Sequence, residues 1–178
     1  AEKQGHVAEA LERLGSFATV GIEPIVAAVE QWRYRNKLEY SFGAAAADDP
    51  SGDPVLGLHA RGRWDRVVDV DDCLLASECN NDARNAVREW AREEGLHAAG
   101  ANGAGQLRNL IVRDGRRTGQ VQTRLVTAAA SIPRPPVDLH TVIAGPSGDT
   151  AGVTGVLGEE FLRERIGPLE LRISPGAF

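Results

Sequence analysis

The chain has 178 residues, 42% of them hydrophobic and 25% charged, and carries a formal net charge of −5. No apolar run approaches the ~18 residues that span a bilayer, so we expect no membrane association. The acidic balance argues against a general nucleic-acid or DNA-binding domain, which is usually basic, so any contact with phosphates must be local. Two cysteines are too few for a disulfide framework, and the polar start lacks the apolar core of a signal peptide, which indicates a cytoplasmic protein.

The first expected element is a short amphipathic helix. Val7, Leu11 and Leu14 recur at spacings of four and three within residues 5–15, which places them on one face, and Gly15 ends the helix.

Strand patterns follow. Alternation over residues 37–42 places Leu38, Tyr40 and Phe42 on one face of a half-buried strand. Turn residues then lead into a second strand, PVLGLHA, which would pair with the first as a hairpin. RGRWDR reads as another turn, and the valines of VVDVDD favour a third strand.

A second helix is predicted over residues 80–95, NNDARNAVREWAREEG. Asn80 or Asn81 is expected to cap it, and Gly95 to end it. Its apolar face consists of Ala83, Val87, Trp90 and Ala91.

The second half of the chain again favours strands. After a glycine-rich connector at 98–105, two β-rich runs flank Asp114-Gly115 as a tight hairpin turn. The prolines of IPRPP indicate a linker. We then expect a strand in DLHTVIA, a loop at 145–152, a short helix in EEFLRERIG and a last strand in LELRIS.

Because strands arrive mostly in hairpins with helices between the groups, the expected fold class is α+β. We predict a largely antiparallel or mixed sheet built from hairpins, with two or three flanking helices. The chain has no dinucleotide fingerprint and no P-loop, so it is not expected to hold a nucleotide cofactor by itself.

Basic residues cluster before and within the first strand. If that strand extends backward, Arg33, Arg35 and Lys37 lie on one face at ~7 Å intervals, which roughly matches phosphate spacing along a single strand. The alternative is a solvated sheet face with Glu39 as the partner.

Two turns carry further arginines. Arg61, Arg63 and Arg66 surround Trp64, where guanidinium groups suit phosphate and an exposed aromatic ring can stack on a base. A second group consists of Arg113, Arg116 and Arg117. Taken singly, each group is also typical of exposed residues in an ordinary turn.

No catalytic or metal-binding constellation emerges from the residues. Cys73 and Cys79 do not have a zinc-finger spacing, so small buried thiols are the structural interpretation. The four histidines are scattered, and no GxSxG motif occurs.

Several blocks in order resemble one family. They are YRNKLEYSFG, LGLHARGRWDRVVDVDDCLLAS, NAVREWAREEGL, LRNLIVRDGRRTGQVQTRLVT and LRISPGAF. Together they resemble the central part of bacterial RNA uridine-5 methyltransferases, which use S-adenosylmethionine to methylate C5 of a uridine in ribosomal or transfer RNA.

The resemblance implies that residues 1–178 are the central, substrate-side α+β domain of a larger protein. An RNA-binding TRAM barrel would precede it, and a Rossmann-like catalytic domain that binds S-adenosylmethionine would follow. C5 of uracil becomes nucleophilic only after a thiolate adds at C6, and neither cysteine here matches that thiolate. The chain by itself is therefore expected to be inactive.

The resemblance also suggests site residues. Cys73 matches the fourth cysteine of members that carry a four-iron four-sulfur cluster, which needs four thiolates. The expected RNA contacts are Arg33, Arg35, Asn36, Lys37, Arg61, Arg63, Arg113 and Phe178, the last being where the family's F-x-Q-x-N element would begin. The alternative functions are a non-catalytic RNA-binding or assembly module of the same architecture, and an α+β domain with solvated basic turns.

Overall fold

The computed structural model describes residues 2–17, 21–44, 52–100, 105–129, 131–136, 140–144 and 155–177. The chain forms two compact units, residues 1–31 and 32–178. Parts of the predicted turn before the second strand and of the 98–105 connector, and the whole 145–152 loop, lie outside the described residues. No helix in the part of the chain that the structure describes is long and apolar enough to cross a membrane.

The first unit contains the predicted N-terminal helix, α1 (Glu2–Arg13). Leu14 and Gly15 form the turn after it. The Gln4 side-chain oxygen accepts a hydrogen bond from the backbone N–H of Ile25 at 3.1 Å, so the segment after the turn contacts the helix. No residue of α1 is buried.

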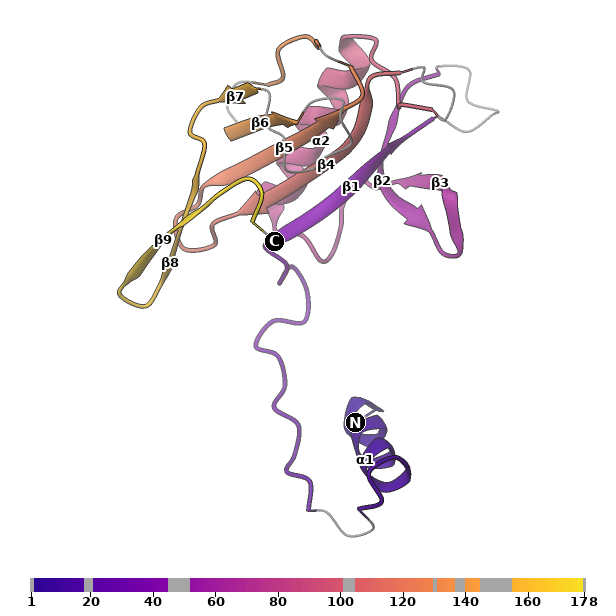
Figure 1. Cartoon of the computed structure of the whole chain (residues 1–178), viewed down its shortest axis with the longest axis vertical. Helices are drawn as coiled ribbons and strands as arrows, with labels where there is room; N and C mark the ends of the chain where they lie inside the picture. The colour runs from indigo at the N-terminus through magenta and orange to yellow at the C-terminus, as the bar shows by residue number, and fades with distance from the viewer. Residues whose placement is uncertain are drawn as a thin grey trace. The chain divides into compact units, whose positions relative to one another are not determined.

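The second unit is built on a seven-stranded sheet with the order β3-β2-β1-β4-β5-β6-β7 (Figure 1). Neighbouring strands are antiparallel except for β5 and β6, which run parallel. The predicted α+β class with a largely antiparallel, mixed sheet is therefore confirmed. The strands are β1 (Lys37–Gly43), β2 (Val55–Ala60), β3 (Arg63–Asp69), β4 (Leu107–Asp114), β5 (Val121–Thr127), β6 (His140–Ala144) and β7 (Gly155–Leu157).

Helix α2 (Glu78–Glu93) packs against β4, β5 and β2 and closes the core. The alternation of β1 is confirmed, because its three apolar side chains are buried beneath the helix and its neighbours. The predicted cap was wrong: Ser77 Oγ accepts from the backbone N–H of Asn80 at 3.2 Å. Asn80 and Asn81 are instead buried inside the helix's first turns. The predicted apolar face of α2 is buried: Ala83, Val87, Trp90 and Ala91.

A separate two-stranded hairpin follows, made of β8 (Leu162–Ile166) and β9 (Leu169–Ile173). The short helix predicted in EEFLRERIG was therefore wrong. The segment is too short for its periodicity to separate helix from strand. Pairing with β9 decides the outcome, because Gly167 takes a φ of 57° and turns the chain back on itself.

The β4–β5 hairpin exists as predicted, but its turn is longer than Asp114-Gly115. Asp114 is the last residue of β4, and residues 115–120 form the connection. Gly115 N–H donates to Gln120 O at 2.8 Å, and the N–H groups of Thr118 and Gly119 donate to Gly115 O. The turn is thus closed by its own backbone.

Candidate nucleic-acid interface

The chain enters β1 along a path that differs from the predicted strand extension. Arg33 has a φ of 53°, and its N–H donates to Leu74 O, while Arg35 N–H donates to Leu75 O at 3.0 Å. Residues 33–35 therefore run beside the segment before α2, and regular strand structure begins at Lys37. The single cationic strand face predicted for Arg33, Arg35 and Lys37 was wrong.

Two of the predicted RNA-contacting arginines are neutralised by carboxylates. Arg33 makes a bidentate ion pair with Asp72, at 2.9 and 3.0 Å. Arg63 makes another with Asp65, at 2.7 and 2.8 Å. The Arg63 hydrogen bonds lower the pKa of Asp65 to about 2, so this pair stays charged at any physiological pH.

A third predicted contact, Arg113, is buried rather than exposed. Its Nη2 donates to the carbonyl of Ala177, and burial lowers the pKa of its guanidinium. Arg124, also buried, donates to Pro175 O at 3.0 Å. These bonds hold residues 175–177 against β4 and β5, while Phe178 itself lies outside the described residues.

Arg35, Lys37 and Arg61 differ from those three arginines. Arg35 and Arg61 are exposed, Lys37 is half-buried, and none of the three makes an ion pair with a described residue. Asn36 is also exposed, and its carbonyl accepts from the N–H of Asp114 at 2.9 Å.

The strand directions point these four residues toward one end of the sheet, although β1 and β2 pair only over residues 41–43 and 55–57. Because β2 runs antiparallel to β1, with Gly43 opposite Val55 and Ser41 opposite Gly57, β2 ends toward the beginning of β1. The β4–β5 turn lies at the same end, since Lys37 pairs with Arg113. We call Arg35, Asn36, Lys37 and Arg61 the basic end.

Glu164 of β8 holds the β4–β5 turn in place. Its carboxylate accepts from the backbone N–H of Arg116 at 2.7 Å and of Arg117 at 3.1 Å. Burial would raise its pKa, but the N–H donors of Arg165, Arg117 and Arg116 outweigh burial and lower the pKa below its ordinary value. An ionised Glu164 therefore fixes a turn beside the basic end.

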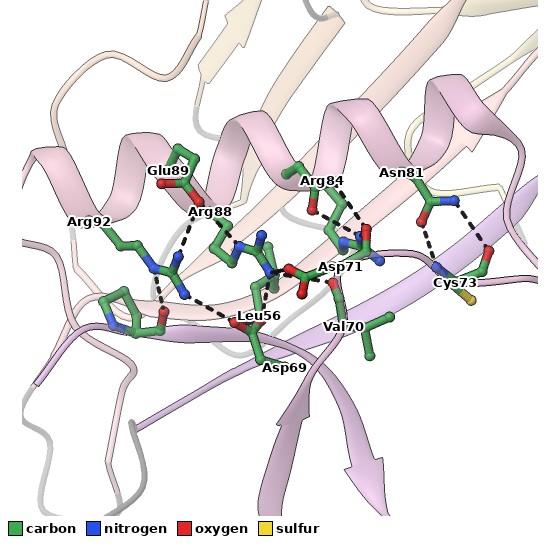
Figure 2. A network of polar contacts seen from close by, with 12 residues as sticks. Leu56, Asp69, Val70, Asp71, Cys73, Asn81, Arg84, Arg88, Glu89 and Arg92 are labelled. Atoms are coloured by element: carbon green, nitrogen blue, oxygen red, sulfur yellow. Dashed lines mark hydrogen bonds and ion pairs between the residues drawn. The ribbon is translucent and has the colours of Figure 1, made fainter. Parts of the chain in front are cut away.

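A polar network that the predicted elements did not include joins α2 to the end of β3 and the segment after it (Figure 2). Arg88 bridges Asp69 at 3.0 Å and Asp71 at 2.8 Å, and Arg92 also pairs with Asp69 at 3.0 Å. A signal existed in the sequence, because arginines at positions 84, 88 and 92 share one helix face and follow an acidic run.

A second set of polar contacts leads from α2 to the basic end. Tyr40 donates its hydroxyl hydrogen to Asn80 Oδ1 at 3.2 Å, and burial raises the pKa of Tyr40 to about 12. The Asn80 amide donates to Val112 O and, at 3.4 Å, to the Asp114 carboxylate. Since Asp114 N–H bonds to Asn36 O, a continuous chain of buried polar contacts supports the start of β1.

Comparison with known proteins finds relatives that are similar in sequence to this chain. An RNA methyltransferase of Chlorobaculum tepidum, named as uncharacterized, is 31% identical over 99% of this chain and 42% of its own length. One of Halalkalibacterium halodurans, named in the same way, is 29% identical over 99% of this chain and 41% of its own length. No protein-family model matches the chain.

The chain is thus homologous to part of these RNA methyltransferases. It spans about two fifths of the length of the curated relatives it matches. A solved structure has the same fold: the tRNA (uracil-54, C5)-methyltransferase of Pyrococcus abyssi in complex with S-adenosyl-L-homocysteine, with a TM-score of 0.66 and 22% identity over 84% of this chain and 38% of that one.

The two cysteines were predicted to be small buried thiols. The prediction holds for Cys73 but not for Cys79, which is exposed. Cys73 is held by its backbone, because its N–H donates to Asn81 Oδ1 at 2.9 Å. Within the described ranges no three His, Cys, Asp or Glu side chains are placed to hold a metal ion. An iron-sulfur cluster needs four thiolates, so these residues alone do not fit one, and the role of Cys73 remains a prediction.

Proposed function

We propose that this chain is the central, RNA-side domain of an S-adenosylmethionine-dependent methyltransferase that modifies C5 of a uridine in ribosomal or transfer RNA. The family supports methyl transfer to RNA. The uracil C5 position and the methyl donor are supported by the name and bound product of the structural neighbour.

One observation carries the RNA-side role: of the six cations predicted to contact RNA, the three that keep an unpaired charge belong to the basic end. Arg33 and Arg63 are neutralised, Arg113 is buried, and the chain as a whole carries a net charge of −5. Arg35, Lys37 and Arg61 keep their charges toward solvent at the basic end. A local cationic patch on an acidic chain suits a backbone that is contacted at a few phosphates only.

The residues of this chain do not supply the chemistry. Attack on C6 of uracil needs an activated, accessible thiolate beside the methyl donor. Cys73 is buried, and the hydroxyl of Ser77, at 3.2 Å, is the described polar neighbour of the Cys79 thiol. We therefore assign the nucleophile, the base and S-adenosylmethionine binding to another part of the full-length protein.

The full-length protein from the same reading frame tests the proposal. Incubated with S-adenosylmethionine labelled on the methyl group and unmodified total RNA, it should produce 5-methyluridine, identified by mass spectrometry of the nucleosides. The 178-residue chain is the matched control and should produce none. Methylation of another atom, or none with any RNA fraction, would overturn the assignment and favour a non-catalytic RNA-binding module.

A further inference from the structure

The β2–β3 hairpin carries an exposed tryptophan on an irregular stretch of strand. Trp64 is 85% exposed. The pairing register passes from His59 opposite Val67 to Ala60 opposite Arg63. Three residues of β3, namely Trp64, Asp65 and Arg66, therefore have no partner on β2. Bulges of this kind redirect side chains away from the sheet.

The bulge is braced from inside. The Arg63 guanidinium donates two hydrogen bonds to the Asp65 carboxylate, only two residues further along the chain. This pair brackets Trp64 on both sides in the chain. Arg63 and Asp65 neutralise one another, so the local charge that remains comes from other residues.

Two cations without carboxylate partners lie on either side of the Arg63–Asp65 pair in the chain. Arg61 at the hairpin turn and Arg66 at the end of the bulge are both exposed, and neither makes an ion pair within the described part of the chain. An exposed indole between unpaired guanidinium groups has the composition of a single-strand nucleic-acid site, where bases stack on aromatic rings and cations contact the backbone.

We infer that Trp64 is a stacking platform for an unpaired RNA base, with Arg61 and Arg66 contacting the adjacent phosphates. This inference rests on the proposed function for RNA as the ligand and adds a subsite that accepts single-stranded RNA. A base inside a duplex is stacked on both faces, so it cannot also lie on the indole.

The test uses the 178-residue chain and an RNA octamer of uridines with one central 2-aminopurine. Stacking on Trp64 should quench the fluorescence of the 2-aminopurine. Trp64→Ala should abolish the quenching and weaken binding about 10-fold, the effect of losing one stacked base. Trp64→Phe retains a ring and should keep most of both signals.

Two controls separate stacking from general effects. Leu169→Ala removes another exposed apolar side chain, on β9, and should leave binding unchanged. The same octamer annealed to its complement should bind more weakly than the single strand. Equal binding of wild type and Trp64→Ala, no binding of the octamer, or a preference for the duplex would each overturn the inference.

The inference and the proposed function can fail separately. If the full-length protein forms 5-methyluridine and Trp64→Ala leaves both quenching and affinity unchanged, only the stacking subsite is wrong. If quenching depends on Trp64 but the full-length protein transfers no methyl group, the subsite stands and the methyltransferase assignment fails.

Discussion

Lys37 on β1 lies directly opposite Arg113 on β4, yet the two cations differ in their exposure to solvent. Like charges directly opposite each other in a sheet are destabilising unless they are separated or neutralised. Here the Arg113 guanidinium is buried and bonds to Ala177 O, while Lys37 stays partly open to solvent. The pair therefore divides into one structural cation and one that is available to a ligand.

This division predicts that RNA affinity depends on the basic end. We expect Arg35→Ala combined with Lys37→Ala to weaken binding of structured RNA and to reduce the slope of log K against log salt by roughly 1.4 to 1.8, because two phosphate contacts are lost. Fluorescence anisotropy across a salt series measures both quantities.

The control for the basic end is Arg134→Ala. Arg134 is an exposed arginine in the connection that follows β5, and it is not one of the four residues of the basic end. The substitution removes one positive charge and leaves the four residues unchanged. RNA binding should therefore weaken at most by the general effect of one lost charge. A loss with Arg134→Ala equal to that of the double variant would contradict the prediction.

Arg113 is expected to act on stability instead. Arg113→Met removes the donor to Ala177 O and leaves a carbonyl without its partner, which should lower the free energy of unfolding by about 1–3 kcal/mol. Urea denaturation followed by circular dichroism measures the change, and Arg35→Ala, at an exposed position, should fall within about 0.5 kcal/mol of wild type. Equal effects from the two variants would refute the distinction between them.

We expect the β4–β5 turn to loosen at acid pH, because Glu164 holds it. Its pKa is lowered in the folded chain, so its contribution to stability is complete above its unfolded pKa and is lost as pH falls through the folded value. The amide NMR shifts of Arg116 and Arg117 should therefore move together as the solution is acidified, because both N–H groups lose an ionised acceptor.

Glu164→Gln is the matched variant for this titration. A neutral amide keeps one acceptor oxygen but cannot titrate, so the joint movement of the two amide shifts should disappear. The free energy of unfolding of the variant should also depend less on pH below about 4.5 than that of wild type, since one depressed carboxyl is gone. Retention of the acid transition in both amides would show that another group controls the turn.

Arg84 is a buried cation without a carboxylate partner among the described residues. Its side chain is 0% exposed and lies 5.2 Å from the Tyr40 ring centroid, and its Nε and Nη1 contact no acceptor in the described part of the chain. Arg84→Ala should cost about 3–5 kcal/mol, because it leaves a cavity and unpaired acceptors. Arg84→Met fills the space without buried unsatisfied donors and should cost less than half as much, as measured by urea denaturation. A methionine variant as unstable as the alanine variant would indicate that the charge itself is required.

Local pattern was sufficient for several elements. The alternation of β1 and the helical spacing of α2 were correct, because a half-buried strand or helix needs its apolar side chains at a fixed period. The same argument failed in EEFLRERIG. Its nine residues fit both the helical and the strand period, so whether they form a helix or a strand depends on a partner strand. Ser77 was missed as the cap because two asparagines follow it, and only their burial in the core shows that they serve another purpose.

By itself the sequence determined the fold class, the core face of β1 and α2, and the presence of an arginine-rich strand entry and turns, because these depend on composition and short-range period. Only the tertiary structure decided which arginines keep a free charge. Arg33 meets Asp72 across 39 residues, Arg113 meets Ala177 across 64, and Glu164 holds the N–H of Arg116 across 48. Such partners follow from how the strands and hairpins pack, so no local pattern distinguishes Arg33 and Arg113 from Arg35, Lys37 and Arg61, which remain available at the basic end. Arg63 differs, because its partner Asp65 lies only two residues away.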